Sequence, residues 1–527
     1  MRGKGNVWLA GISLLAGCGG VWDACGQALA GRPARPNVIV ILADDMGIGD
    51  PGCYNPESRI RTPHLDRLAG QGMRFTDAHS PSSVCTPTRY GLMTGRYAWR
   101  TRLQSGVLFG LSGPLIAPGR PTVASLLQNA GYRTACFGKW HLGLGWAGTV
   151  TDDPHLKGGS VEYGKPLSDS PLTHGFERFF GISGSLDMPP YAFIENDRLP
   201  VAPSVITAEG GREGPTAPGF SAPQVLPAIT RKAVEFIAES AAQAKTKQPF
   251  FLYLPLNAPH TPVVPSGVWR REGHPLGHYA GFVEQVDDTV GQIVKAVDEH
   301  GLAESTLILF TSDNGYAPYV GIVTGDDRRS GKGGVKALEA EGHFPSAAYR
   351  GYKSELWEGG HRVPFIARWT GTVAAGAVCD GLVGLQDLFA TAAELTGTEP
   401  PEKGGEDSLS FLPLLLGRPG RRTDMVLHSL HGRFALREGR WKLIAWRGSG
   451  GYSDGRKGKD GRPVHAGLPA FQLYDLEADP RETGNLADRH PGTVSRLMLR
   501  LQKQVAEGRS TPGPAARNDV AVQLLKP

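Results

Sequence analysis

The sequence predicts an α/β protein with a large, mostly parallel sheet covered by helices. A smaller C-terminal α+β domain built on an antiparallel sheet is predicted to follow it. Two observations carry this prediction. Four apolar runs of strand length are separated by stretches with helical periodicity, and each run ends in a group of polar residues. Beyond residue 420 the pattern changes to short strand-like runs that follow one another closely.

The four predicted strands are Asn37–Leu42, Tyr132–Phe137, Pro249–Pro255 and Ser305–Thr311. Apolar residues at three- and four-residue steps from Tyr279 to Val297 predict a helix just before the last of them. Alternating strands and helices favour parallel pairing. Open parallel sheets bind their ligands beyond the carboxyl ends of the strands. We therefore expect the polar groups that follow these strands to meet at one edge of the sheet.

A segment rich in proline, glycine and charge, residues 396–422, is predicted to lead into the second domain. Its strand-like runs are expected at Met425–Ser429, Arg433–Arg437 and Trp441–Trp446, and a helix is expected at Thr493–Val505. The chain between these elements includes Gln472–Pro480 and Asn485–Ala487. The predicted division is therefore a catalytic domain at 36–420 and a C-terminal subdomain at 421–527.

Residues 1–30 are predicted to be an export signal. Basic residues precede an apolar run, Val7–Ala16, that is too short to span a bilayer as a stable helix. The stretch Leu15–Cys18 resembles a bacterial lipobox, which would give a lipidated Cys18, and cleavage after Ala30 is the alternative. Both predict an exported protein, periplasmic or on the outer surface, that meets a membrane only through a lipid anchor.

Composition excludes some classes of function. The 527 residues are enough for a large domain and a smaller one, and the net charge is +5. This weak basicity is compatible with a polyanionic substrate. Since there is no long run of lysine and arginine, nucleic acid is not expected as a partner.

The cysteines do not form a disulfide scaffold or a zinc site. Four of them lie beyond the export signal, without zinc-like spacing: Cys53, Cys85, Cys136 and Cys379. With Cys85 set aside, at most one disulfide can form among the other three.

The stretch Val84–Arg96, V-C-T-P-T-R-Y-G-L-M-T-G-R, predicts a helix that begins near Cys85. Pro87 suits the first helical turn, and Arg89 would lie one turn from Cys85 on the same face. A helix N-terminus favours an anion. For an isolated cysteine, a buried structural role is the alternative. The expected capping residues are Ser82, Ser83 and Thr86.

The polar groups after the strands predict a metal and anion site. Hard oxygen donors come from two strand ends, Asp44 and Asp45 from one and Asp313 and Asn314 from the other, which selects Ca²⁺ or Mg²⁺ over zinc. Taken singly, these residues could be ordinary turn or surface residues. Cationic hydrogen bonds to a tetrahedral anion are expected from Arg89, Lys139, His141 and His260.

The pattern C-x-P-x-R followed by L-M-T-G-R resembles the signature of the type I sulfatases, in the alkaline-phosphatase-like superfamily. In that family the cysteine is oxidised to formylglycine, an aldehyde present as a geminal diol. Thr88, where serine is commoner, departs from the pattern. The resemblance extends from about Pro36 to the end of the chain, and it implies a formylglycine-generating or an anaerobic sulfatase-maturing enzyme as a partner.

The resemblance also implies a role for each site residue. Residues matching Asp44, Asp45, Asp313 and Asn314 hold a calcium ion in the family, and the one matching Arg89 steadies the formylglycine. Lys139 and His141 would bind the sulfate and the diol. His260 and Lys353, in Gly351–Gly360, would face the departing ester oxygen, and Ser185 matches a sulfate-contacting serine.

The function implied is removal of sulfate from a carbohydrate, and the stretch Ser185–Tyr191 resembles bacterial relatives that act on sulfated glycans. One hydroxyl of the diol would attack sulfur, and the second would later expel the sulfate. Two alternatives stay open. One is a phosphonate or phosphate diester hydrolase of the same superfamily. The other is a non-catalytic glycan-binding surface protein in which Cys85 stays a thiol.

Overall fold

The structure is a computed structural model. It describes residues 35–148, 161–246, 248–325, 331–399, 401, 403–455, 457 and 463–526. Arg35–Pro527 forms one compact unit. The predicted export signal, with its lipobox at Leu15–Cys18 and the alternative cleavage after Ala30, lies outside the described residues.

A nine-stranded sheet forms the centre of this unit. In spatial order its strands are β12 (Ala377–Cys379), β2 (Met73–Phe75), β11 (Phe365–Arg368), β10 (Thr306–Ser312), β1 (Asn37–Ala43), β9 (Phe250–Pro255), β4 (Arg133–Lys139), β5 (Arg178–Ile182) and β6 (Ile194–Glu195). The five strands from β10 to β5 run parallel, and β11 and β6 pair antiparallel with the two ends of that group. The four strands predicted from sequence are therefore confirmed as neighbours in one sheet.

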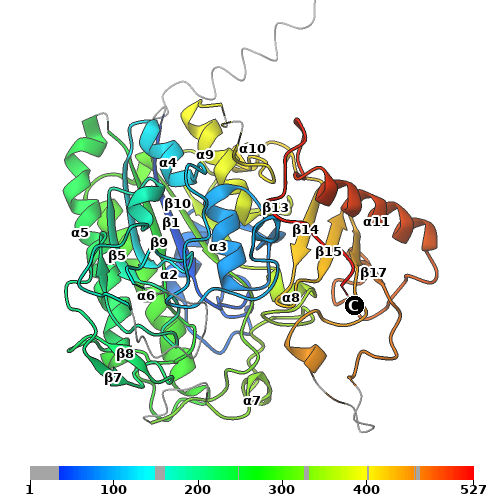
Figure 1. The fold of residues 1–527 in the computed structure, drawn as a ribbon, viewed down its shortest axis with the longest axis horizontal. Coiled ribbons are helices and arrows are strands. Elements are labelled where there is room, and N and C mark those ends of the chain that lie inside the picture. The colour runs from blue at the N-terminus through cyan, green and yellow to red at the C-terminus, as the bar shows by residue number, and fades with distance from the viewer. Residues whose placement is uncertain are drawn as a thin grey trace, which may run out of the picture. The chain divides into compact units, whose positions relative to one another are not determined.

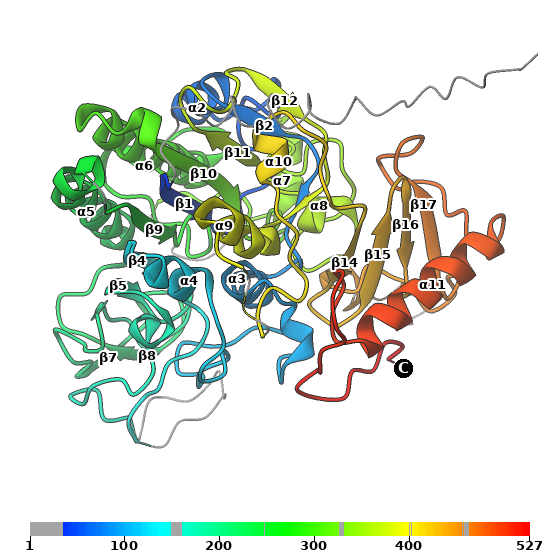
Figure 2. The ribbon, with the colours of Figure 1, turned by 90° about the horizontal axis from the view of Figure 1, so that it is seen from above.

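Helices cover both faces of the sheet, because alternate residues of the central strand enter two different cores. Val38, Val40 and Leu42 pack with α3 (Cys85–Thr94), α4 (Val123–Asn129) and α9 (Leu388–Thr396). Ile39, Ile41 and Ala43 pack with α2 (Pro63–Gly70), α5 (Val225–Thr246) and α6 (Gly277–Glu299). Figure 2 shows the two groups of helices on opposite sides of the sheet.

The C-terminal part is a separate antiparallel sheet, β14 (Asp424–His428), β15 (Phe434–Glu438), β16 (Trp441–Ile444) and β17 (Gln472–Asp475). Helix α11 (Pro491–Ala506) lies across it (Figure 1). Leu497 and Leu501 of this helix share a core with strand residues and with Tyr97 and Trp99, which follow α3. The predicted fold class is confirmed. The division at residue 420 stays a prediction, since this core joins residues from both sides of it.

The remaining elements are short: β3 (Ala78–His79) with β13 (Val383–Gly384), β7 (Val205–Thr207) with β8 (Gly214–Thr216), and helices α7 (Val335–Ala340), α8 (Glu358–His361) and α10 (Leu412–Leu415). Cys53, Cys85, Cys136 and Cys379 are free thiols, so the described residues contain no disulfide. Across the same residues, every helix is too short or too polar to cross a bilayer.

Candidate active site

Helix α3 begins at Cys85, as predicted, but the predicted caps are wrong. Its N-cap is Val84, and the described residues provide no side-chain cap. The hydroxyl groups of Ser82 and Ser83 donate instead to the carbonyl of His428, at 3.0 and 3.4 Å. The chain leading into the helix is thus held by the C-terminal sheet rather than by a local capping bond.

Parallel pairing of β1 with β10 brings the acidic residues together. The register sets Ala43 opposite Ser312, so the residues that follow, Asp44 and Asp313, leave the sheet side by side. The Asp45 N–H donates to Asp313 Oδ1 at 3.2 Å. Asn314 Nδ2 donates to Asp45 Oδ1 at 2.7 Å. Two strand ends 269 residues apart in sequence thus form one cluster of oxygen atoms.

Three cations pair with the three carboxylates, and all six side chains are buried. Arg89 donates to Asp313 Oδ2 from Nε at 3.0 Å and from Nη2 at 2.7 Å. The ammonium groups of the two lysines contact the other two carboxylates: Lys139 lies 2.7 Å from Asp44 Oδ2, and Lys353 lies 2.6 Å from Asp45 Oδ1. The formal charges of these six groups therefore cancel.

The carboxylates are nevertheless crowded. Burial would raise the pKa of Asp44, but Lys139, His260 and Arg89 together hold it well below its usual range. Burial, and next the charge of Asp44, raise the pKa of Asp313 to about 6. An additional cation beside these oxygens would therefore be favourable.

The oxygen cluster fits a divalent cation. Asp44 Oδ1 and Asn314 Oδ1 are buried acceptors without a hydrogen-bond partner among the described residues. Such atoms are costly unless something positive faces them, and Asp44 Oδ1 has Arg89 Nη2 at 3.6 Å, beyond hydrogen-bonding distance. Carboxylate and amide oxygens are the ligands that Ca²⁺ and Mg²⁺ prefer. One ligand atom each of Asp44, Asp45 and His260 lies within 4.8 Å of the others, so an imidazole nitrogen is also near.

His141 is a neutral acceptor, which differs from the cationic donor that the sequence suggested. Burial lowers the pKa of its imidazole far below the usual value, and Lys139 and Arg89 act in the same direction. Its Nε2 lies 2.7 Å from the carbonyl oxygen of Leu108 and must donate, because a carbonyl can only accept. Nδ1 is then a buried lone pair without a partner in the described part of the chain. It suits a hydroxyl group better than a sulfate oxygen.

The two residues expected at the leaving group lie on either side of Asp45. His260 Nδ1 lies 2.5 Å from the carbonyl oxygen of Thr261 and donates to it, which leaves Nε2 facing Asp45 Oδ2 at 3.6 Å. Lys353 contacts the same carboxylate. Burial would lower the pKa of Lys353, but Asp45 raises it well above its ordinary value. Lys353 is therefore a fixed positive charge.

Cys85 is buried, and burial raises the pKa of its thiol although Lys139 and Lys353 oppose this. A thiol that stays protonated is a poor nucleophile.

Ser185 follows β5, the neighbour of β4 in the sheet, and takes no part in the ion pairs described above. Its buried hydroxyl has no hydrogen-bond partner within the described residues. The side-chain nitrogen and oxygen of Asn257 are also buried without a hydrogen-bond partner among the described residues. Sequence reasoning gave Asn257 no role, although its place at the end of β9, three residues before His260, is the signal that could have found it.

Three of the six non-glycine residues with positive φ angles in the described part of the chain lie here. Asp45, His141 and Ser354 have positive φ angles of 65°, 55° and 83°. Non-glycine residues in this region cost about 1–3 kcal/mol each and persist where the surroundings hold them, commonly at functional sites. Gly138, with φ 138°, has no alternative, because a Cβ atom there would lie 1.9 Å from the carbonyl oxygen of Pro255. Its neighbour Lys139 is thereby placed close to the adjacent strand.

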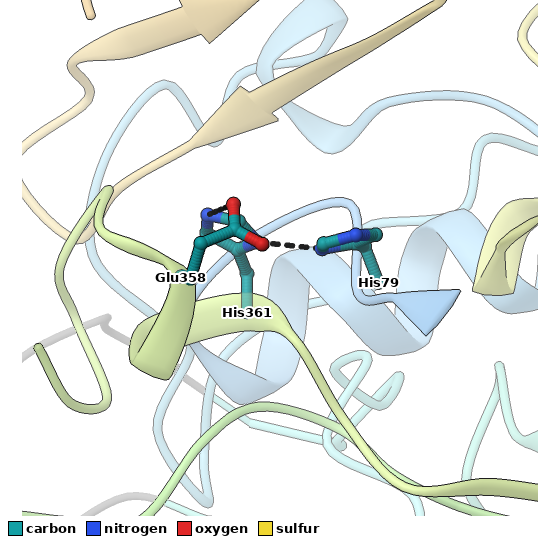
Figure 3. Close-up of side chains that lie close together, drawn as sticks. All are labelled: His79, Glu358 and His361. Carbon is teal, nitrogen blue, oxygen red and sulfur yellow. Dashed lines mark hydrogen bonds and ion pairs between the residues drawn. The ribbon is translucent and has the colours of Figure 1, made fainter. Parts of the chain in front are cut away.

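A second buried cluster contains His79, Glu358 and His361, whose side chains point toward one another (Figure 3). Its groups are already paired inside the protein. The Nδ1 atoms of the two histidines are 3.0 Å apart, and the Glu358 carboxylate accepts from Lys442 at 2.8 Å and from Arg362 at 2.7 Å. Because Glu358 is neutralised twice, the cluster suits a structural contact between α8 and β16 better than a metal ion.

Comparison with known proteins gives consistent matches. A family model described as Sulfatase matches residues 36–398. The N-acetylgalactosamine-6-O-sulfatase of Bacteroides thetaiotaomicron is 33% identical over 94% of this chain and 97% of its own. Human arylsulfatase A is 32% identical over 95% of this chain and 94% of its own. A solved 6S-sulf structure, from work on glycosaminoglycan metabolism by Bacteroides thetaiotaomicron, has a TM-score of 0.74 at 31% identity and covers 89% of this chain and 99% of its own.

Proposed function

The chain belongs to the sulfatase family, and from this membership we propose that it removes sulfate from a glycan with a formylglycine made from Cys85 and a bound Ca²⁺ or Mg²⁺. The predicted family and the enzyme class, sulfuric ester hydrolase, are confirmed. One observation carries the proposal: Cys85 starts a helix beside the buried cluster of three carboxylates and three cations.

Modification of Cys85 accounts for its surroundings. As a thiol it is held protonated by burial. Formylglycine supplies a hydrated aldehyde, whose hydroxyl oxygen is the nucleophile toward sulfur. The Nδ1 lone pair of His141 is an acceptor for a hydroxyl proton in this region, and Arg89 fixes Asp313 in place.

The cation would be held by Asp44, Asp45, Asp313 and Asn314. It would supply positive charge toward the oxygens of the sulfate ester. The charges of the three carboxylates and of Arg89, Lys139 and Lys353 cancel, so a divalent ion leaves the site net positive, as binding of an anionic ester requires.

The leaving oxygen needs a proton. His260 Nδ1 donates to the carbonyl oxygen of Thr261, so Nε2 of the same ring is the atom that would carry a proton to the ester oxygen. Lys353 stays charged beside it, which lowers the cost of negative charge on the departing oxygen. Lys139 would bind a sulfate oxygen, and Ser185 offers its unpartnered hydroxyl to another.

The substrate we propose is a 6-O-sulfated N-acetylhexosamine within a glycan. The bacterial relative that covers nearly the whole chain is named N-acetylgalactosamine-6-O-sulfatase, which supports this class. We also propose that the protein is exported, matured by a formylglycine-generating or an anaerobic sulfatase-maturing enzyme, and anchored by Cys18 or released by cleavage after Ala30.

The test combines mass spectrometry of the peptide around Cys85 with assays on matched esters, using protein from a host that matures sulfatases. We expect an aldehyde at Cys85 and faster sulfate release from 6-O-sulfated than from 2-O- or 4-O-sulfated disaccharides. An aldehyde with faster cleavage of phosphate diesters would assign the diester hydrolases instead. An unmodified thiol with saccharide binding and no turnover would assign a binding protein.

A further inference from the structure

Two partly exposed tyrosines, Tyr319 and Tyr452, lie beside Lys353 and come from different parts of the fold. Their rings form an edge-to-face pair with centroids 5.7 Å apart at 75°. Tyr319 is 36% exposed and Tyr452 is 41% exposed, unlike the buried aromatic residues of the two main cores. We call these two residues the tyrosine pair.

Hydrogen bonds tie Tyr452 and the chain just before Tyr319 to the Lys353 segment. The backbone N–H of Tyr452 donates to Ser354 Oγ at 2.9 Å. The backbone N–H of Lys353 donates to the carbonyl oxygen of Tyr316 at 2.9 Å, and Tyr316 lies three residues before Tyr319. Both chain segments that carry the tyrosine pair therefore run beside the Lys353 segment.

Hydrogen bonds hold the loop that carries Tyr452. Asp454 accepts hydrogen bonds from the backbone N–H groups of Ser449, at 2.7 Å, and Gly450, at 2.9 Å. A Cβ atom on Gly451 would lie 2.3 Å from the carbonyl oxygen of Ser354, so the loop passes against the Lys353 segment as closely as a backbone can. Such a loop can present an aromatic ring at little entropic cost.

The charges of the site act on both phenols. Partial enclosure raises the pKa of both tyrosines, Lys353 opposes this in each case, and Asp45 adds to it. A cavity of about 470 Å³ has Pro318 and Ser453, the chain neighbours of the two tyrosines, in its wall, but neither tyrosine lines it. The pair itself is therefore the surface that a sugar could contact.

We propose that the tyrosine pair is a sugar-binding subsite, on which the pyranose ring that carries the sulfate stacks. Partly exposed aromatic rings beside a catalytic group offer an apolar face to the C–H side of a sugar, while their hydroxyl groups stay available for hydrogen bonds. The inference rests on the proposed function, because it assigns the sulfated sugar to this place.

The test compares Tyr319→Ala and Tyr452→Ala with Tyr319→Phe and Tyr452→Phe. For a 6-O-sulfated disaccharide, each alanine variant should raise KM about 10-fold with little change in kcat, since one aromatic contact is worth roughly that factor. The phenylalanine variants keep the ring and should stay within about 3-fold of wild type. Leu499→Ala, a change at a 66% exposed residue of α11, is the matched surface control.

Binding of the desulfated disaccharide, measured by calorimetry on each variant, tests the sugar subsite separately from the proposed sulfatase activity. This ligand lacks the sulfate, so its affinity reports the sugar contacts alone. Weaker binding to the alanine variants, with unfolding temperatures equal to wild type, supports the subsite even if no sulfate ester is turned over. Unchanged KM and affinity in both alanine variants would overturn it, and so would phenylalanine variants as weak as the alanine ones.

Discussion

Lys442 of β16 is expected to contribute strongly to the free energy of unfolding, because it joins the C-terminal sheet to α8. Its buried ammonium lies 2.8 Å from Glu358 Oε1 and 2.9 Å from Glu482 Oε1. In Lys442→Met, Glu358 would keep Arg362, while the described residues leave Glu482 only the backbone N–H of Glu358, at 2.7 Å. Breaking a buried pair from one side costs about 3–5 kcal/mol, and we expect this loss of unfolding free energy at pH 8.

The loss should depend on pH with a definite sign. Burial raises the pKa of Glu482 to about 7, although Lys442 opposes this. A carboxyl whose pKa is raised by folding is favoured in its protonated form, so the wild type loses stability as pH rises from the ordinary carboxyl range through about 7. Without Lys442 the pKa of Glu482 rises further, so the Glu482 carboxyl of the variant is protonated in the folded state at pH 6. The loss of unfolding free energy relative to wild type should then be smaller by about 1 kcal/mol at pH 6 than at pH 8.

Urea unfolding followed by tryptophan fluorescence at both pH values measures these differences. The matched control is the double variant Lys442→Met with Glu482→Gln, which removes both charges and keeps an acceptor for the Glu358 N–H. It should recover most of the loss, because removing both partners of a buried pair costs little. A single variant that loses less than about 1 kcal/mol, or a double variant as weak as the single one, would refute the reasoning.

Four further predictions concern the chemistry. Cys85→Ser should release at most one leaving alcohol per enzyme in a quench experiment, because a plain alcohol has no second hydroxyl to expel sulfate; steady turnover would contradict the mechanism. Arg89→Lys should lower kcat/KM about 100- to 1000-fold, since lysine cannot place two N–H groups on Asp313, and a near-wild-type rate would count against this role. Removal of metal by a chelator should abolish activity and lower the unfolding temperature, both restored by Ca²⁺; unchanged values would exclude a resident cation. His260→Ala should slow a sugar sulfate about 100-fold or more but an activated aryl sulfate far less, and equal losses would exclude proton donation by His260.

The part of the fold that could be predicted consists of segments whose sequence pattern is compatible with only one kind of secondary structure and pairing. Apart from Asn37 at its start, the strand Asn37–Ala43 is apolar, and in the structure both of its faces are covered. Because such strands pair in parallel, Asp44 and Asp313 could be expected together without any knowledge of the intervening 268 residues. Three of the four C-terminal strands were also expected from their patterns, each within two residues of its observed bounds, whereas β17 was not.

The remainder depends on contacts that have no local signal. Val84 replaces the expected serine caps because Ser82 and Ser83 bond to His428, more than 340 residues away. The tautomer of His141 follows from one carbonyl, that of Leu108. Tyr452 lies in a glycine- and serine-rich stretch with neither helical nor strand periodicity, and contacts distant in sequence, such as its bond to Ser354, hold it beside the Lys353 segment.

Ser354 shows why the site needs both parts of the fold. Its N–H donates to the carbonyl of Ser83 at 2.7 Å, and its own carbonyl accepts from Leu430 at 3.2 Å. Its hydroxyl accepts from Tyr452 at 2.9 Å. One residue, at a positive φ of 83°, thereby joins the chain before Cys85, the Lys353 segment and two loops of the C-terminal sheet. Contacts with Ser83 and with the C-terminal part together hold this strained backbone. The C-terminal sheet therefore helps to set the distance between Cys85 and Lys353, and it does so from outside the edge of the main sheet at which Asp44 and Asp313 meet.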